Sequence, residues 1–152
     1  MTAPCCYGSW AFFPDVREKY FGMIVYRSIQ TSDYEAVQTF LAANGFAARV
    51  SDPERFRAMI EGADRTVVAF DGGRVVGFAR ALCDGASNGY ISMVAVAEAQ
   101  RRQGIGRRLV EHLTHADSGE ITWVLRAGHG SRGFWERMGF AASEVAMERV
   151  RR

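Results

Sequence analysis

The segment 94–110 constrains this chain most, because it joins a strand, a basic turn and a helix in one short stretch. An alternating apolar run ends at Val96, and a helix is expected to begin near Gly104. The first N–H groups of a helix have no intrahelical partner, and the aligned peptide dipoles add partial positive charge there. Gly104 and Gly106 lack the Cβ atoms that would hold an anion away from the backbone. The segment therefore predicts a phosphate or pyrophosphate site.

Three arginines surround the same turn. Arg101, Arg102 and Arg107 would add full positive charge around a bound anion. An ordinary strand-to-helix loop with a solvated basic face has the same bare pattern, so the pattern alone leaves both interpretations open. The turn lacks the Gly-Lys-Ser/Thr of a P-loop and the Gly-x-Gly-x-x-Gly of dinucleotide-binding folds, which excludes both of those phosphate sites here.

Two segments together resemble the motifs of the GNAT acetyltransferase superfamily. The acetyl-coenzyme A motif of that family is similar to Val94-Ala95-Val96 followed by Arg101-Arg102-Gln103-Gly104-Ile105-Gly106. The segment 134–140, Phe-Trp-Glu-Arg-Met-Gly-Phe, resembles the Phe-Tyr-x-x-x-Gly-Phe signature near the end of that fold. The two segments lie in the family's order and at its spacing, and the resemblance extends from Met23 over about 130 residues.

Length and composition favour one domain. The chain has 152 residues, of which 48% are hydrophobic, enough for a sizeable core. Residues 1–22 mix proline and glycine with aromatics and show neither helical nor strand periodicity. We expect them to be an N-terminal extension, poorly ordered or loosely packed, with a GNAT domain at 23–152. A less favoured interpretation places Trp10, Phe12 and Phe13 over an apolar patch.

The charge and cysteine content argue against several classes. A net charge of +2, without a basic run interleaved with aromatics, gives no support for nucleic-acid binding. No apolar run approaches the ~20 residues of a membrane span, and no Cys/His cluster has metal-site spacing. The odd number of cysteines gives no complete disulfide framework. We therefore expect a cytoplasmic protein that binds no metal, membrane or nucleic acid.

Hydrophobic periodicity predicts the order of elements. Helices are expected after the capping residues 31–33, and at 53–62, 104–116 and 131–138; strands at 24–28, 66–70, 75–82, 89–96, 121–125 and 145–150. A tight hairpin is predicted at Asp71-Gly72-Gly73, and the strand 121–125, apolar on both faces, is expected to be central. This order describes a mixed α/β fold. With the resemblance, it implies a largely antiparallel twisted sheet of about six to seven strands, with about four helices on both faces.

The resemblance implies acetyl-CoA as the cofactor. In the family, the pantetheine arm enters between two strands that splay apart, and the backbone of the fourth strand binds it. By motif position that strand is 94–96, and the pyrophosphate lies against the N–H groups of 103–107. Phe134 and Trp135 belong to the second motif and are expected to contact the cofactor. The expected cofactor-binding residues are Val94, Ala95, Val96, Arg101, Arg102, Gln103, Gly104, Ile105, Gly106, Arg107, Phe134 and Trp135.

The acid and base of the reaction are less clear from the sequence. The family often protonates the departing thiolate with the tyrosine of its second motif, where this chain has Trp135. An indole N–H is no acid near neutral pH. Because the thiolate of coenzyme A is a good leaving group, we expect a lower rate and not a blocked reaction. Tyr90 and Ser92 are the candidate catalytic residues, with a structural role in the strand as the alternative for both; Asp84 is expected to be a turn residue.

The resemblance implies an N-acetyltransferase that moves the acetyl group of acetyl-CoA to the primary amine of a small molecule by direct attack. Neither Cys83 nor Ser131 has partners arranged as an activated nucleophile. Phe46, Arg49 and Arg80 are candidates to face the acceptor, and arginines there favour a carboxylate or phosphate on it. Two alternatives stay open: a CoA-binding protein of GNAT fold without catalysis, and an acyltransferase that uses a longer acyl-CoA. Analogy also suggests a homodimer.

Overall fold

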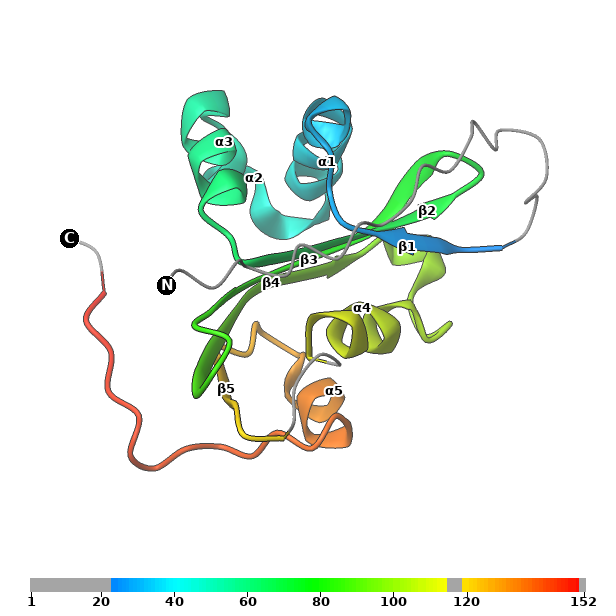
Figure 1. Cartoon of the computed structure of the whole chain (residues 1–152). Coiled ribbons are helices and arrows are strands. Elements are labelled where there is room, and N and C mark those ends of the chain that lie inside the picture. Colours follow the sequence, from blue (N-terminus) through cyan, green and yellow to red (C-terminus); the bar gives the residue numbers. More distant parts are fainter. Residues whose placement is uncertain (1–22, 115–118, 151–152) are drawn as a thin grey trace, which may run out of the picture.

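A five-stranded sheet runs through the middle of the protein, with helices on both faces (Figure 1). The computed structural model describes residues 23–114 and 119–150. The strands are β1 (Val25–Arg27), β2 (Arg65–Asp71), β3 (Arg74–Cys83), β4 (Asn88–Val96) and β5 (Thr122–Leu125). They lie side by side in chain order; β1 to β4 are antiparallel, and β5 is parallel to β4. This confirms the predicted mixed α/β fold with a largely antiparallel sheet, although the described sheet has five strands and not the expected six to seven. The predicted N-terminal extension, with Trp10, Phe12 and Phe13, lies outside the described residues.

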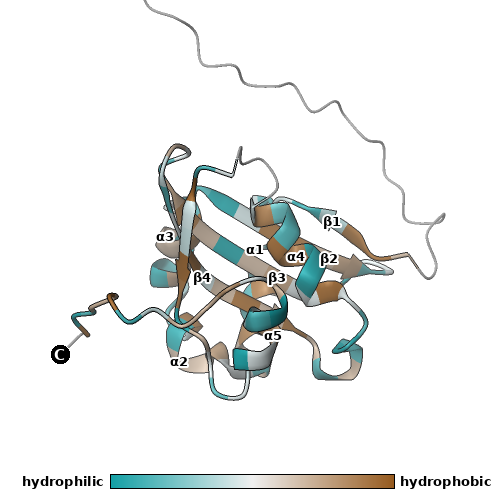
Figure 2. Cartoon of the chain, turned by 90° about the horizontal axis from the view of Figure 1, so that it is seen from below, coloured by the Kyte–Doolittle hydropathy of each residue, from teal (hydrophilic) through white to brown (hydrophobic). Residues whose placement is uncertain are grey.

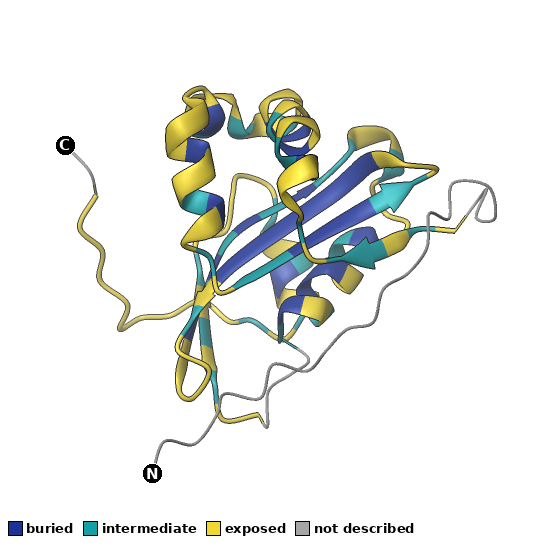
Figure 3. Cartoon of the chain, turned by 45° about the horizontal axis from the view of Figure 1, so that its top comes forward, coloured by how far each residue is buried: buried dark blue, intermediate teal, exposed yellow. Residues whose placement is uncertain are grey.

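The helices form one layer on each side of the sheet (Figure 1). One layer contains α1 (Tyr34–Leu41), α2 (Ala47–Val50) and α3 (Pro53–Glu61), and the other contains α4 (Ile105–Thr114) and α5 (Arg132–Arg137). Short helical turns are η1 (Thr31–Asp33), η2 (Ala42–Phe46) and η3 (Glu98–Gln100). Each layer covers its own apolar cluster, so the sheet is buried on both faces in β2, β3 and β4 (Figure 3). The two clusters fix the distance of each helix layer from the sheet.

Local chemistry explains most of the element boundaries. The side chain of Asp52 accepts hydrogen bonds from the N–H groups of Glu54 (3.0 Å) and Arg55 (3.2 Å), and Pro53 occupies the first turn of α3. The β2–β3 turn consists of Gly72 and Gly73, both with positive φ, as a tight hairpin turn requires. Both features confirm the predicted boundaries.

A β-bulge interrupts β4 at Ser92. Arg80 of β3 pairs with Met93, but the next residue, Ala81, pairs with Ile91, so Ser92 is an extra residue without a partner on β3. The bulge changes which face the following side chains occupy. Ile91 packs in the cluster under α4, whereas Met93, two residues later, packs in the cluster under α1 and α3.

The last predicted strand was wrong. The segment 145–150 is not a strand, and residues 141–150 are all exposed, with Val145 at 89% and Met147 at 98%. The segment reads Val-Ala-Met-Glu-Arg-Val, in which apolar residues flank a charged pair (Figure 2), so its alternation is incomplete, and a strand also needs a neighbouring strand that pairs with it. None of the described strands does so.

The strand 121–125 also differs from its prediction. β5 lies at an edge of the described sheet, and Thr122 and Val124 are exposed, so it is not a central strand. The other face does pack as expected, because Trp123 and Leu125 contact the cluster under α4 and α5. The apolar side chain of Val124 led us to expect burial, but no described element covers that face of β5.

Candidate active site

The two parallel strands β4 and β5 separate halfway along β4. Their pairing runs from Asn88 with Thr122 to Ile91 with Leu125, and β4 then continues to Val96 with β3 on one side and no strand on the other. In a sheet, each strand exposes backbone N–H and C=O groups toward both neighbours. Within the described chain, no strand pairs with residues 92–96 on the β5 side, so the backbone groups that point to this side have no strand partner. The predicted residues Val94, Ala95 and Val96 lie on this edge.

The turn after β4 has the backbone geometry of an anion-binding site. Two of its residues, Arg102 (φ 63°) and Gly104 (φ 83°), have left-handed conformations. The N–H of Arg108 donates to the carbonyl of Gly104 at 3.1 Å and begins the helical pattern of α4. The N–H groups of Ile105, Gly106 and Arg107 therefore precede that pattern and stay available at the positive end of the helix dipole.

Three elements meet at Gly106. A Cβ atom at this glycine would lie 3.4 Å from the ring of Phe134 on α5 and 3.6 Å from the side chain of Val96 on β4. The end of β4, the start of α4 and α5 are therefore adjacent. The structure thus brings together the strand, the turn and Phe134, which the sequence placed in two separate motifs.

Trp135 lies in the protein core. It is 8% exposed and packs edge to face with Phe134, at a centroid distance of 4.9 Å, and with Phe140, at 5.3 Å. The three rings belong to one segment, and together they pack in the α4-side cluster. Packing therefore explains this tryptophan, and its contact with the cofactor stays a prediction.

The polar side chains of the turn are partly engaged by the protein itself. The Nε of Arg101 donates to the carbonyl of Val96 at 3.3 Å, and Arg107 pairs with Glu111 at 3.2 Å on the exposed face of α4. The side chain of Gln103 donates to the carbonyl of Ala99 at 3.4 Å. Arg102 is exposed. Arg101 is thus held at the end of β4, whereas Arg107 points along α4 toward Glu111.

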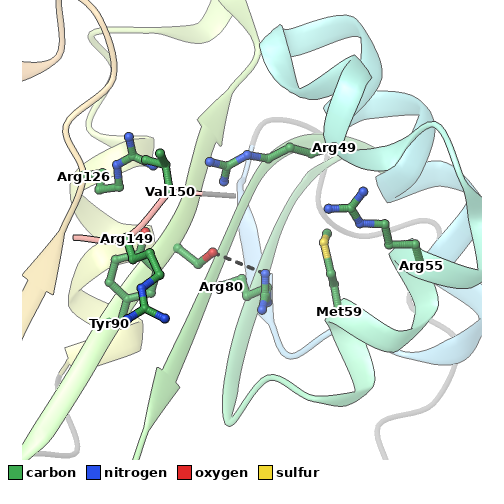
Figure 4. Close-up of a pocket in the computed structure, with 9 residues that line it drawn as sticks. Arg49, Arg55, Met59, Arg80, Tyr90, Arg126, Arg149 and Val150 are labelled. Carbon is green, nitrogen blue, oxygen red and sulfur yellow. Dashed lines mark hydrogen bonds between the residues drawn. The ribbon is translucent and has the colours of Figure 1, made fainter. Parts of the chain in front are cut away.

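A cavity of about 560 Å³ lies at the other end of the open part of β4 (Figure 4). Both candidate catalytic residues, Tyr90 and Ser92, line it. Its other lining residues come from α2, α3, β3 and the segments after β5: Arg49, Arg55, Met59, Arg80, Arg126, Arg149 and Val150. The cavity and the turn thus lie at opposite ends of the part of β4 that has no β5 partner, with residues 93–96 between them.

Arg80 is the most buried cation of this cavity. It is 8% exposed, and its Nη1 donates to the hydroxyl of Ser92 at 3.3 Å (Figure 4). Its Nε is buried and has no hydrogen-bond partner in the described part of the chain. Burial lowers the pKa of Arg80, the positive charge of Arg49 lowers it further, and Tyr90 acts in the opposite direction. An arginine nevertheless stays protonated in proteins, so the cavity contains a buried cation.

Asp84 is a turn residue, as expected. Its carboxylate accepts hydrogen bonds from the N–H groups of Ala86 (2.8 Å), Ser87 (2.8 Å) and Asn88 (3.0 Å). These hydrogen bonds lower the pKa of Asp84 far below its ordinary value. A carboxylate held so firmly in its charged form is a poor proton acceptor.

Sequence reasoning found Arg49 and Arg80 but missed several cavity residues: Arg55, Met59, Arg126, Arg149 and Val150. Arg55 and Met59 are one helical turn apart, so their helix could have been placed beside the acceptor. Phe46 packs against the α1-side cluster and does not line the cavity. Within 23–114 and 119–150, no group of three or more His, Cys, Asp or Glu side chains is arranged to hold a metal ion. None of the helices in those two ranges has the length and apolar character to cross a membrane.

Comparisons with known proteins identify the family. The family model described as "Acetyltransferase (GNAT) domain" matches residues 29–150. A search of curated protein sequences gave no match. Among solved structures, a probable acetyltransferase of Staphylococcus aureus is similar, with a TM-score of 0.72, 18% identity, and coverage of 86% of this chain and 100% of that one.

Two further structures share the fold. An alanine N-acetyltransferase of a ribosomal protein from Escherichia coli has a TM-score of 0.66 and 23% identity, over 80% of this chain and 79% of its own. An aminoglycoside N-acetyltransferase, solved in complex with CoA, has a TM-score of 0.66 and 13% identity, over 86% of this chain and 95% of its own. The chain belongs to the GNAT family of acetyltransferases and is an acyltransferase.

Proposed function

We propose that this protein transfers the acetyl group of acetyl-CoA to the primary amine of a small molecule by direct attack. The open edge of β4 at residues 92–96 carries the proposal, because it leads from the amides at the start of α4 to the cavity with Tyr90 and Ser92. Such an edge offers N–H and C=O groups to an extended chain, and the helix start offers N–H groups to an anion.

The residues present fit acetyl-CoA. Gly104 has a left-handed conformation, and a Cβ atom at this position would point into open space, where a bound pyrophosphate has room. The amides of residues 103–107, together with Arg101, Arg102 and Arg107, would hold the pyrophosphate, and Val94, Ala95 and Val96 would hold the pantetheine arm. Phe134, half-buried beside Gly106, would cover the cofactor from the α5 side. When bound, acetyl-CoA supplies an acetyl group already activated as a thioester.

Backbone groups would stabilise the transition state of acetyl transfer. A fixed N–H on β4 that points at the acetyl carbonyl would stabilise the negative charge developing on that oxygen, an effect of about 3 kcal/mol in other enzymes. Trp135 offers no acid, so solvent would protonate the departing thiolate. Tyr90 and Ser92 are the hydroxyl groups of the cavity that can orient the amine by hydrogen bonds, and the proton that the amine loses would pass to solvent.

The surroundings of the possible nucleophiles support direct attack. The sulfur of Cys83 accepts a hydrogen bond from the N–H of Gly85 at 3.2 Å, and the hydroxyl of Ser131 donates to the carbonyl of Gly128 at 2.8 Å. Neither group has a base beside it among the contacts of the described residues, as an acyl-enzyme mechanism would require.

Thiol release from acetyl-CoA, measured with a panel of primary amines and with mass detection of the acetylated product, tests the proposal. We expect release that depends on the amine. Tyr90→Phe should lower kcat by about 100-fold with little change in KM, because it removes a hydroxyl that orients the amine in the transition state. Tyr34→Phe is the matched control, since Tyr34 packs edge to face on Phe56 away from the cavity, and it should leave kcat unchanged.

Two results would contradict the proposal. Binding of acetyl-CoA without release for any amine would identify a CoA-binding protein without catalysis. Faster turnover with a longer acyl-CoA would identify an acyltransferase of different acyl specificity.

A further inference from the structure

The cavity beside β4 has an unusual excess of positive charge. Its arginines come from five separate parts of the chain: Arg49 on α2, Arg55 on α3, Arg80 on β3, Arg126 after β5 and Arg149 near the C-terminus (Figure 4). No acidic side chain lines the cavity within the described chain. Arg126 pairs with Glu148 at 2.9 Å, whereas the other arginines form no ion pair with a described residue. The charges therefore add to a positive potential inside the cavity.

The guanidinium of Arg80 has too few hydrogen-bond acceptors among the described residues for a buried charge. A guanidinium carries five N–H donors, and the described residues give this one a single side-chain acceptor, the hydroxyl of Ser92. Its Nε is fully buried without a partner. A buried donor without an acceptor destabilises a folded protein, and a charged one does so more strongly. An anion in the cavity would supply the missing acceptors in the forked geometry that arginine prefers.

We infer that the acceptor of this enzyme is a small amine that also carries a carboxylate or phosphate group, which Arg80 binds at the floor of the cavity with support from Arg49 and Arg55. The inference rests on the acetyl transfer proposed above and names the substrate class of the same site. Figure 4 shows the side chains of Arg49 and Arg55 extending toward the cavity from their helices. The same charges disfavour a polycationic acceptor, because like charges repel it.

The spacing along β4 limits the size of the acceptor. Ser92, the hydrogen-bond partner of Arg80, lies two residues before Val94, the first of the β4 residues that are proposed to hold the pantetheine arm. At about 3.3 Å per residue in a strand, the two positions are about 7 Å apart. One small molecule could therefore reach both Arg80 and the end of the pantetheine arm, which favours a compact acceptor such as an amino acid or an amino-alkyl phosphate.

Matched pairs of amines test this inference. One member of each pair carries the anion and the other does not: glycine, alanine, phenylalanine and glutamate against their carboxamides, and phosphoethanolamine against ethanolamine. We expect the parent to prefer anionic members by about tenfold or more in kcat/KM, mainly through KM. Arg80→Gln should lower kcat/KM for the anionic members by about 30-fold or more and should lower it less for the neutral members, so that the preference for anions is lost.

Two further variants keep the test independent of the folding of Arg80→Gln. The double variant Arg49→Gln/Arg55→Gln changes residues that are half-buried and exposed, and it should reduce the preference for anions by about tenfold. Arg57→Gln is the matched control, because Arg57 lies on the same helix as Arg55 but pairs with Glu61 and does not line the cavity. This control should leave the preference unchanged.

The results separate the two proposals. Equal use of anionic and neutral amines, or an unchanged preference in folded Arg80→Gln, would overturn the anionic acceptor while acetyl transfer stands. If no amine is acetylated, the proposal of acetyl transfer to small amines fails. Calorimetric titration of the same amines in the presence of CoA then tests whether the cavity binds anionic amines. Binding of the anionic members alone, lost in Arg80→Gln, would still support the inference. Absence of any such binding would overturn it.

Discussion

Asp33 and Arg80 are the two buried charged side chains of the described residues, and each is 8% exposed. The carboxylate of Asp33 accepts hydrogen bonds from Arg27 at 2.6 and 2.9 Å and from the N–H of Gln30 at 2.8 Å. Arg80 donates one side-chain hydrogen bond, to the hydroxyl of Ser92, and its buried Nε has no partner among the described residues. Asp33 is thus satisfied by the fold, whereas Arg80 needs a ligand, so the distinction between a structural and a functional buried charge lies in its partners.

The Asp33 pair makes stability depend on pH. Burial acts to raise the pKa of Asp33, but the hydrogen bonds from Arg27 and Gln30 and the charge of Arg27 outweigh it and lower the pKa below its ordinary value. The stabilisation is therefore present above the unfolded pKa of about 3.9 and is lost as the pH falls through the folded pKa. Asp33→Asn should lower the free energy of unfolding by about 2 kcal/mol at neutral pH.

Urea unfolding at several pH values checks this prediction. The difference between Asp33→Asn and the parent should shrink as the pH falls below about 4. Glu61→Gln, which removes the exposed pair with Arg57, is the control and should change the free energy by less than about 0.5 kcal/mol. A difference for Asp33→Asn that stays constant down to low pH would contradict the ionic role of Asp33.

At the scale of elements, strands and helices with strong local signals were predictable. The caps at Asp52 and the hairpin at Gly72 and Gly73 act within a few residues, so the sequence is enough to locate them. The bulge at Ser92 was not predictable, because the alternation of β4 continues through it and the bulge exists only in the register with β3. The side chains that line the cavity depend on that register.

Contact between β3 and α4 sets the position of the turn after β4. A Cβ atom at Gly77 would lie 3.0 Å from Leu109, 3.1 Å from Ile105 and 3.3 Å from the Cβ of Ala69. Gly77→Ala should therefore push the start of α4 away from the sheet, lower the free energy of unfolding by about 1–3 kcal/mol and weaken acetyl-CoA binding.

Urea unfolding and calorimetry measure both effects of Gly77→Ala. Gly133→Ala on α5 is the control, because its Cβ would contact only the end of the Arg137 side chain, at 3.5 Å, and alanine favours helix. It should be neutral or stabilising. A Gly77→Ala variant as stable as the parent would show that α4 does not pack so closely on the sheet.

At the scale of the whole molecule, the candidate site joins parts that are distant in the sequence. The two cofactor motifs could be found in the sequence because each is a short pattern within a single segment of the chain. The cavity was only partly visible, because Arg126 and Arg149 reach it from segments whose placement depends on the complete fold. The segment 145–150 shows the converse, since its strand-like pattern has no partner strand among the described residues.

Calorimetric titration with acetyl-CoA tests the central claim most directly. The parent should bind with a Kd of about 10 µM or lower. Gly104→Asp would place a carboxylate where the pyrophosphate is proposed to lie, and it should weaken binding by at least about 100-fold. Gly73→Asp is the matched control, because Gly73 has almost the same φ (84° against 83°) but lies in the β2–β3 hairpin. Binding lost in folded Gly104→Asp and kept in Gly73→Asp is the predicted result. No binding by the parent, or unchanged binding by Gly104→Asp, would contradict the assignment of the cofactor site.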